Sequence, residues 1–91
     1  MTTYQKIRRG MLAAELRVTM LVADAGPRGY WHGRIMQLSS ENAWTRLRKR
    51  GLLVEVPGTS NMQLARTPSA TRRAIKREYA DVAQGQAQVQ S

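Results

Sequence analysis

Several residue types are scarce or missing in this sequence of 91 residues. Cysteine is absent, which excludes a disulfide framework and a thiolate metal site. With His32 as the single histidine, a zinc site cannot be assembled either. Two tryptophans, three tyrosines and no phenylalanine leave a core of aliphatic side chains, which favours helices. We therefore expect a helical protein without a metal or any other cofactor.

Long apolar runs are missing as well. The basic start around Arg8 and Arg9, followed by residues 11–14, mimics a signal peptide, but Glu15 and Arg17 interrupt the apolar region at once. Nowhere does an apolar run approach the roughly 18 residues that a membrane-spanning helix requires. We expect a soluble, cytoplasmic protein with no membrane partner.

Positively charged residues are abundant. Lysine and arginine total 15 against 6 aspartates and glutamates, which gives a net charge of +9, and 12 of the 15 cations are arginine. Such a balance indicates affinity for phosphate polyanions, nucleic acid first. The six carboxylates are scattered and form no constellation with a serine or histidine. We expect no enzymatic activity.

The length allows one domain, which we place at residues 1–83, followed by a disordered tail at 84–91. Apolar spacings of 3 and 4 predict a first helix over residues 4–25, with a break expected at Gly10 and a stop at Gly26-Pro27. A short second helix is expected over 30–38, with Tyr30 and Trp31 in its core. A third helix is expected to be capped by Ser39 or Ser40 and to end near Arg50. A hairpin of strands 53–56 and 62–66, with its turn at 57–61, and a last helix opened by Thr67-Pro68 complete the prediction.

This order resembles the winged helix-turn-helix of MarR-type and PadR-type bacterial regulators. The run Ser39-Ser40-Glu41-Asn42-Ala43-Trp44-Thr45-Arg46-Leu47-Arg48-Lys49-Arg50-Gly51-Leu52-Leu53 is similar to the family's recognition helix and the strand that follows it. The run Leu64-Ala65-Arg66-Thr67-Pro68-Ser69-Ala70-Thr71-Arg72-Arg73 is similar to the family's exit from the wing. The resemblance implies a mainly α fold with a small β-hairpin, in the order α-α-α-β-β-α, and a divergent member such as those of phages and plasmids.

Residues 40–50 contain the candidate DNA-reading face. On a helical wheel with Ala43 and Leu47 inward, Asn42, Thr45 and Lys49 point outward, and Arg46 and Arg48 lie on the edges. Asn binds adenine, Arg binds guanine and the Thr methyl contacts thymine in the major groove. Trp44, beside an inward leucine, is expected to pack in the core rather than stack on a ligand. The predicted DNA-binding residues are Ser40, Asn42, Thr45, Arg46, Arg48, Lys49, Thr59, Ser60, Asn61, Arg66, Arg72 and Arg73.

The leading hypothesis is therefore a small sequence-specific DNA-binding regulator, a repressor or autoregulator in the nucleoid. The alternatives are an architectural winged-helix protein, either excisionase-like or a partition adaptor, and a winged helix used for protein contacts. We expect a homodimer on double-stranded DNA, regulated by dosage or by a partner protein, because no effector pocket is evident. The two candidate dimer surfaces are Tyr4, Ile7 and Met11 on the first helix, and Ile75, Tyr79 and Val82 on the last.

Overall fold

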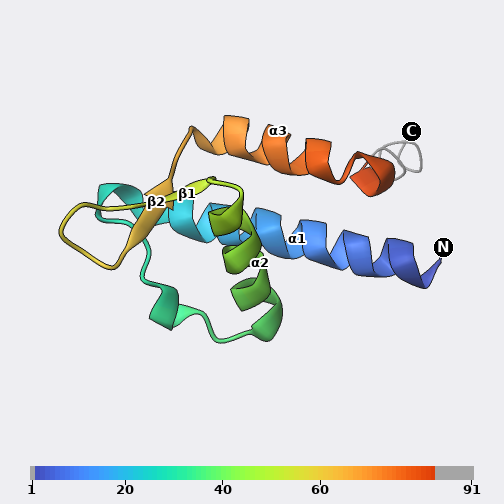
Figure 1. Ribbon diagram of the computed structural model, residues 1–91, viewed down its shortest axis with the longest axis horizontal. Helices are drawn as coiled ribbons and strands as arrows, with labels where there is room; N and C mark the ends of the chain where they lie inside the picture. Colours follow the sequence, from blue (N-terminus) through green and yellow to red (C-terminus); the bar gives the residue numbers. More distant parts are fainter. Residues whose placement is uncertain (1, 84–91) are drawn as a thin grey trace.

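The computed structural model describes residues 2–83 of the chain. Figure 1 shows a long first helix crossed by a second, a hairpin at the far end of the first helix, and a third helix alongside it. In chain order the elements are α1 (Thr3–Asp24), 3-10 turns at Gly26–Arg28 and His32–Arg34, α2 (Leu38–Lys49), β1 (Leu53–Glu55), β2 (Met62–Leu64) and α3 (Pro68–Glu78). The expected mainly helical fold with a small antiparallel hairpin is confirmed at this level, and the predicted tail at 84–91 lies outside the described residues.

Helix α1 is continuous, so the break expected at Gly10 is wrong. A capping box holds its first turn, in which the Thr2 hydroxyl accepts from the Gln5 amide at 3.1 Å and the Gln5 side chain accepts from the Thr2 amide at 3.0 Å. One glycine costs a helix about 1 kcal/mol relative to alanine, which a capped and packed helix of 22 residues tolerates. The predicted stop is confirmed, because α1 ends at Asp24 and Gly26 follows.

The short helix expected over residues 30–38 does not form. Tyr30 instead pairs with β2: its amide donates to the Met62 carbonyl at 2.7 Å, and its carbonyl accepts from the Met62 amide at 3.0 Å. Gly29 permits this approach, since a Cβ there would lie 2.7 Å from Val56 Cγ2 and 2.8 Å from the Met62 carbonyl oxygen. Sheet pairing therefore overrides the helical spacing of the apolar residues, and Trp31 stays 54% exposed instead of entering a core.

Helix α2 begins one residue before the predicted caps. Gln37 is its N-cap and makes no side-chain capping bond, so the expected serine cap is wrong, and Ser40 lies buried inside the first turn. Ala43 and Leu47 are buried, as the helical wheel predicts, and so is Trp44, which confirms that this tryptophan packs in the core. The helix ends at Lys49, close to the predicted end.

The hairpin and α3 follow the sequence closely. Strands β1 and β2 pair antiparallel, with Leu53 opposite Leu64 and Glu55 opposite Met62. Thr67 then caps α3 as predicted: its hydroxyl accepts from the Ala70 amide at 3.1 Å, and Pro68 takes the first helical position.

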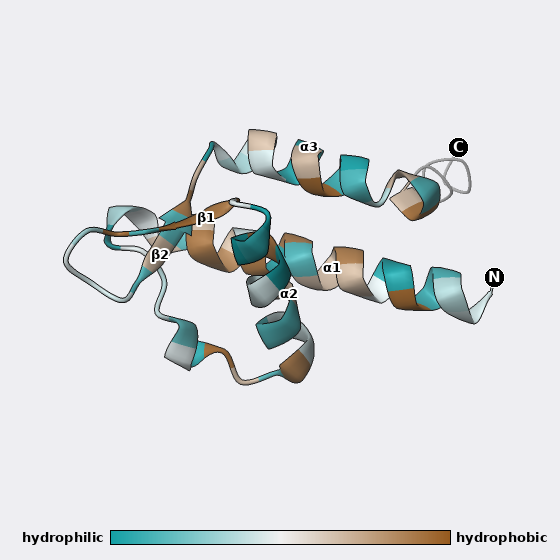
Figure 2. Cartoon of the chain, in the orientation of Figure 1, coloured by the Kyte–Doolittle hydropathy of each residue, from teal (hydrophilic) through white to brown (hydrophobic). Residues whose placement is uncertain are grey.

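Helix α1 is the centre of the core. Helices α2 and α3 and strand β2 all pack on it. Figure 2 shows hydrophobic residues along α1 and on the side of α3 that faces it. Val18 of α1, Leu47 of α2 and Ile75 of α3 each have 1% exposure or less. The buried apolar cluster consists of Leu12, Ala14, Val18, Val22, Ala43, Trp44, Leu47, Leu52, Leu53, Met62, Ile75, Tyr79 and Val82.

Replacing Leu47 tests the orientation of α2. Leu47→Ala should lower the free energy of unfolding by about 2 to 5 kcal/mol, because it removes a fully buried leucine and leaves a cavity. Thr45→Ala, an exposed position on the same helix, should change it by less than about 0.5 kcal/mol. Urea unfolding followed by circular dichroism measures both. Equal stabilities for the two variants would contradict the observed rotation of α2.

Candidate nucleic-acid interface

The outer face of α2 carries the side chains that were predicted to read bases. Asn42, Thr45, Arg48 and Lys49 are all exposed. The Thr45 hydroxyl donates to the Glu41 carbonyl at 3.1 Å, which fixes the side chain and leaves its methyl group free for contacts. The face therefore presents amide, methyl and cationic groups on one rigid helix.

Two predicted contact residues do not belong to this face. Ser40 is only 5% exposed, so it is too buried to reach a ligand. Arg46 turns inward, where its Nε donates to Glu15 Oε2 at 2.8 Å. The helical wheel placed Arg46 at an edge, and the buried carboxylate on α1 draws it toward the core.

The hairpin loop supplies a second exposed segment. Thr59 and Ser60 are exposed, as a contact role requires. The Thr59 hydroxyl donates to the Val56 carbonyl at 2.9 Å and closes the loop. Asn61 is partly buried, and its side-chain amide donates to the Arg28 carbonyl at 3.1 Å, so it fastens the loop to the 3-10 turn after α1.

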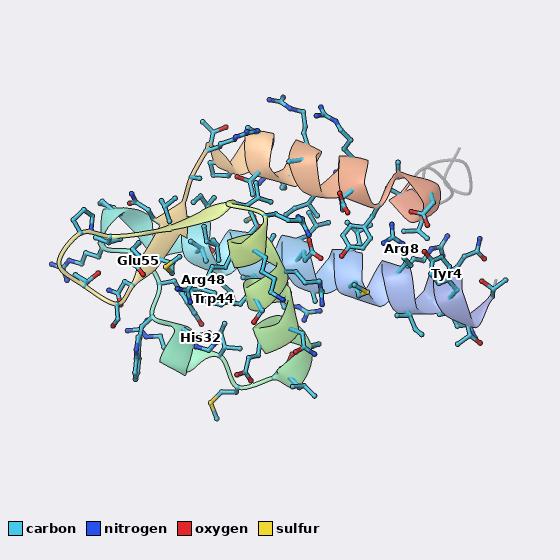
Figure 3. The ribbon with its side chains drawn as sticks, viewed as in Figure 1. Tyr4, Arg8, His32, Trp44, Arg48 and Glu55 are labelled. Atoms are coloured by element: carbon cyan, nitrogen blue, oxygen red, sulfur yellow. The ribbon has the colours of Figure 1, made fainter. Side chains whose placement is uncertain are left out.

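An open groove separates α2 from the hairpin. It has a volume of about 850 Å³, and its third side is the segment 31–33 that precedes α2. Figure 3 shows Trp44 and Arg48 extending from α2 toward Glu55 of β1, with His32 on the segment below. The lining residues of the groove are Trp31, His32, Gly33, Trp44, Thr45, Arg48, Lys49, Glu55, Ser60 and Met62.

The predicted cations near α3 lie apart from this groove, which no α3 residue lines. Arg66 and Arg73 are exposed. Arg72 is half-buried along α1, with Nη1 3.6 Å from Met20 Sδ and Nη2 3.4 Å from Ser69 Oγ. The structure thus gathers Thr45, Arg48, Lys49 and Ser60 around one groove. Asn42 instead lines a separate hollow between α2 and α1, and the α3 residues lie elsewhere.

A buried ionic cluster beneath α2 was not predicted. Glu15 of α1 is 0% exposed and accepts hydrogen bonds from Arg46 of α2 and from the Tyr79 hydroxyl beyond α3. Arg50 Nη2 lies 2.7 Å from Glu15 Oε1, in a close ion pair that lacks hydrogen-bond angles. The available signal was the position of Glu15, which falls within the apolar face formed by Leu12, Val18 and Val22.

The cluster shifts the titration of its members. Burial raises the pKa of Tyr79 above its ordinary value, and the hydrogen bond and charge of Glu15 raise it further. Burial alone would lower the pKa of Arg50, but the contact with Glu15 outweighs it, so the pKa of Arg50 is raised. Both shifts keep these groups in the protonated forms that Glu15 binds.

The candidate dimer surfaces differ in exposure. Tyr4 and Ile7 are 64% and 58% exposed near the start of α1, so this part of the first surface is available. Met11, its third residue, is partly buried against the core. The second surface is not available, because Ile75, Tyr79 and Val82 are at most 2% exposed and belong to the core. The expectation that these three residues pair across a dimer is therefore wrong.

Comparisons with protein-family models, with curated proteins and with solved structures found no match to this chain. Among residues 2–83, no helix is long and apolar enough to cross a membrane. Within the same range, no three side chains of histidine, cysteine, aspartate or glutamate are grouped as a metal site would need.

Removing the charge of Glu15 tests the ionic cluster. Glu15→Gln should lower the free energy of unfolding by about 3 kcal/mol, because it leaves two half-buried guanidinium groups without their carboxylate. Glu55→Gln is the matched control, since its carboxylate is 66% exposed and lies 3.9 Å from Arg48, where little stabilisation is expected. Guanidinium chloride unfolding measures both variants. A stability for Glu15→Gln equal to that of the control would show that the cluster does not stabilise the fold.

Proposed function

We propose that this protein is a small sequence-specific DNA-binding transcription regulator, a repressor or autoregulator built on a divergent winged helix-turn-helix. The observation that carries the proposal is the exposed face of α2, with Asn42, Thr45, Arg48 and Lys49, beside an exposed hairpin loop. The net charge of +9 supports a polyanionic partner. In this proposal α2 is the recognition helix, the hairpin is the wing, and the segment 30–37 replaces the first helix of the helix-turn-helix.

The proposed mechanism separates base reading from backbone contact. Helix α2 enters the major groove, where Asn42 binds adenine, the Thr45 methyl contacts thymine and Arg48 binds guanine. Lys49 and the loop residues Thr59 and Ser60 bind phosphates and fix the register on the duplex. The bound protein blocks a promoter. Arg66 and Arg73 are exposed for further phosphate contacts.

Charge placement supports α2 as the reading helix. Four cations lie between Arg46 and Arg50, and the two that face the core, Arg46 and Arg50, share the single negative charge of Glu15. Arg48 and Lys49 remain on the outer side, where they are exposed. The positive charge that α2 presents to a partner is therefore concentrated on the face that carries Asn42 and Thr45.

Substitutions on α2 test base reading. Asn42→Ala or Thr45→Ala should relax sequence preference at one or two base pairs, since a lost base contact costs about 1 to 3 kcal/mol of discrimination. Selection from randomised duplexes identifies the preferred site and measures the change. Lys49→Ala is the control, because loss of a phosphate contact weakens binding to all sequences and reduces the salt slope by about 1.

Unchanged site preference in both variants would contradict the role assigned to α2. A nuclease footprint on the DNA flanking the protein's own gene then distinguishes regulation from an architectural role. One short palindrome supports a repressor, whereas a long phased array indicates an architectural protein.

A homodimer follows from the proposal, because one winged helix reads about one half-site. The apolar stripe of α1 continues past the core as Tyr4 and Ile7, and a second copy would cover both side chains. Ile7→Glu should convert the dimer to a monomer in sedimentation, whereas Ala13→Glu, on the opposite side of α1, should not. The slope of log K against log salt should fall from between about −5 and −9 to roughly half. A monomeric native protein would refute this arrangement.

A further inference from the structure

The groove beside α2 contains an exposed tryptophan in a fixed position. Trp31 is 54% exposed and lines the groove, in a fold whose other tryptophan, Trp44, is 3% exposed. Its indole lies directly over Gly33, because a Cβ at Gly33 would stand 2.5 Å from Trp31 Cζ2 and 2.7 Å from Cε2 and Cη2. The indole therefore packs flat against the backbone of Gly33.

The residues on either side of this tryptophan pack their rings on Trp44 of α2. The His32 ring lies 5.2 Å from the Trp44 ring, and the Tyr30 ring lies 6.0 Å from Trp44, both at tilted angles. These distances are typical of packed aromatic pairs. Trp44 in turn belongs to the buried core. The segment that carries Trp31 is thus anchored to the core through its neighbours, and the exposed indole of Trp31 presents π surface to the groove.

Two cations line the groove from α2. These are Arg48 and Lys49, and both are exposed. The carboxylate nearest to Arg48 is Glu55, at 3.9 Å, with both side chains at least 60% exposed. An ion pair of this length and exposure is weak, so a phosphate can replace Glu55 as the partner of Arg48.

We infer that this groove binds an unpaired nucleobase, stacked on Trp31, with its phosphate at Arg48 and Lys49. A flat π surface beside two cations is the combination with which proteins bind single-stranded nucleic acid. A volume of about 850 Å³ is ample for one nucleotide. The bases of an intact duplex are stacked on each other and cannot cover Trp31, so this activity is additional to duplex recognition.

Two kinds of ligand offer a base together with a phosphate: a single strand of nucleic acid and a free nucleotide. Stacking on a tryptophan favours no particular base, because every base has a π face. The groove is therefore a site for an unpaired nucleotide of any sequence, in contrast to the base reading proposed for Asn42 and Thr45.

Three probes test the site on the full chain. Fluorescein-labelled dT12 supplies bases and phosphates, an abasic 12-mer supplies the phosphates alone, and thymidine monophosphate supplies one free nucleotide as a competitor. Fluorescence anisotropy measures the affinities, and quenching of tryptophan emission reports stacking. The protein should bind dT12 at least about 5-fold more tightly than the abasic strand, and only dT12 should quench the tryptophans.

Two variants locate the site. Trp31→Leu should remove the preference for dT12 over the abasic strand, with a loss of roughly 5- to 150-fold in dT12 affinity. Gly33→Ala should reduce the preference for dT12 over the abasic strand although the tryptophan is retained, because the added Cβ displaces the indole from its position against the Gly33 backbone. Met36→Ala is the matched control: Met36 is 90% exposed, lies outside the groove lining and should bind dT12 as the native protein does.

Equal binding of dT12 and the abasic strand would overturn the inference, as would a folded Trp31→Leu variant that keeps the preference. Competition by thymidine monophosphate supports the groove as a site for free nucleotides as well, and lack of competition supports a site that takes bases only on a strand. None of these measurements contains a duplex. A failure here therefore leaves the duplex recognition by α2 standing, and a failure of duplex recognition leaves this site standing.

Discussion

The carboxylate of Glu15 is the point at which all three helices are joined. It lies on the buried face of α1 and binds Arg46 and Arg50 of the α2 region together with the Tyr79 hydroxyl after α3. Arg46 and Arg50 are four residues apart, one helical turn, so both approach Glu15 from the same side of α2. Another rotation of α2 would move both guanidinium groups away and leave the buried charge with the Tyr79 hydroxyl but no cation, which is strongly unfavourable. The outward direction of Thr45 follows from that constraint, whereas Asn42, one turn before Arg46, lies at the edge of α2 next to α1.

A second set of contacts joins the first part of α1 to the residues that follow α3. Arg8 Nη2 donates to Asp81 Oδ1 and to the Glu78 carbonyl, both at 2.9 Å, and its guanidinium lies 4.4 Å from the centre of the Tyr79 ring. Arg8 thus lowers the pKa of Asp81. In Figure 3, Arg8 and Tyr4 lie on α1 below the end of α3. Tyr79 is held on both sides, through its ring by Arg8 and through its hydroxyl by Glu15.

The sequence was informative wherever local signals and burial agreed. The Thr67 cap, the hairpin turn and the inward side of α2 all combine short-range chemistry with a hydrophobic pattern, and the structure agrees with each. The helix predicted over residues 30–38 was wrong because the apolar spacing suited a helix, while the observed pairing of Tyr30 with Met62 depends on a strand far along the chain. The prediction that Arg46 contacts DNA was wrong for a similar reason, since its buried partner Glu15 lies 31 residues away in the sequence. The groove could not be predicted, because it exists only between three separate segments.

The pairing of Tyr30 with Met62 fixes the shape of the groove. Two backbone hydrogen bonds attach the residue before Trp31 to the first residue of β2, and the Asn61 side chain adds a third link to Arg28. The Tyr30 and His32 rings also pack on Trp44 of α2, and Leu53, Met62 and Trp44 belong to one buried cluster. The segment before α2, the hairpin and α2 are therefore held to one another around the groove. A ligand would meet a groove that is already shaped, so little of its binding free energy would be spent on ordering the protein.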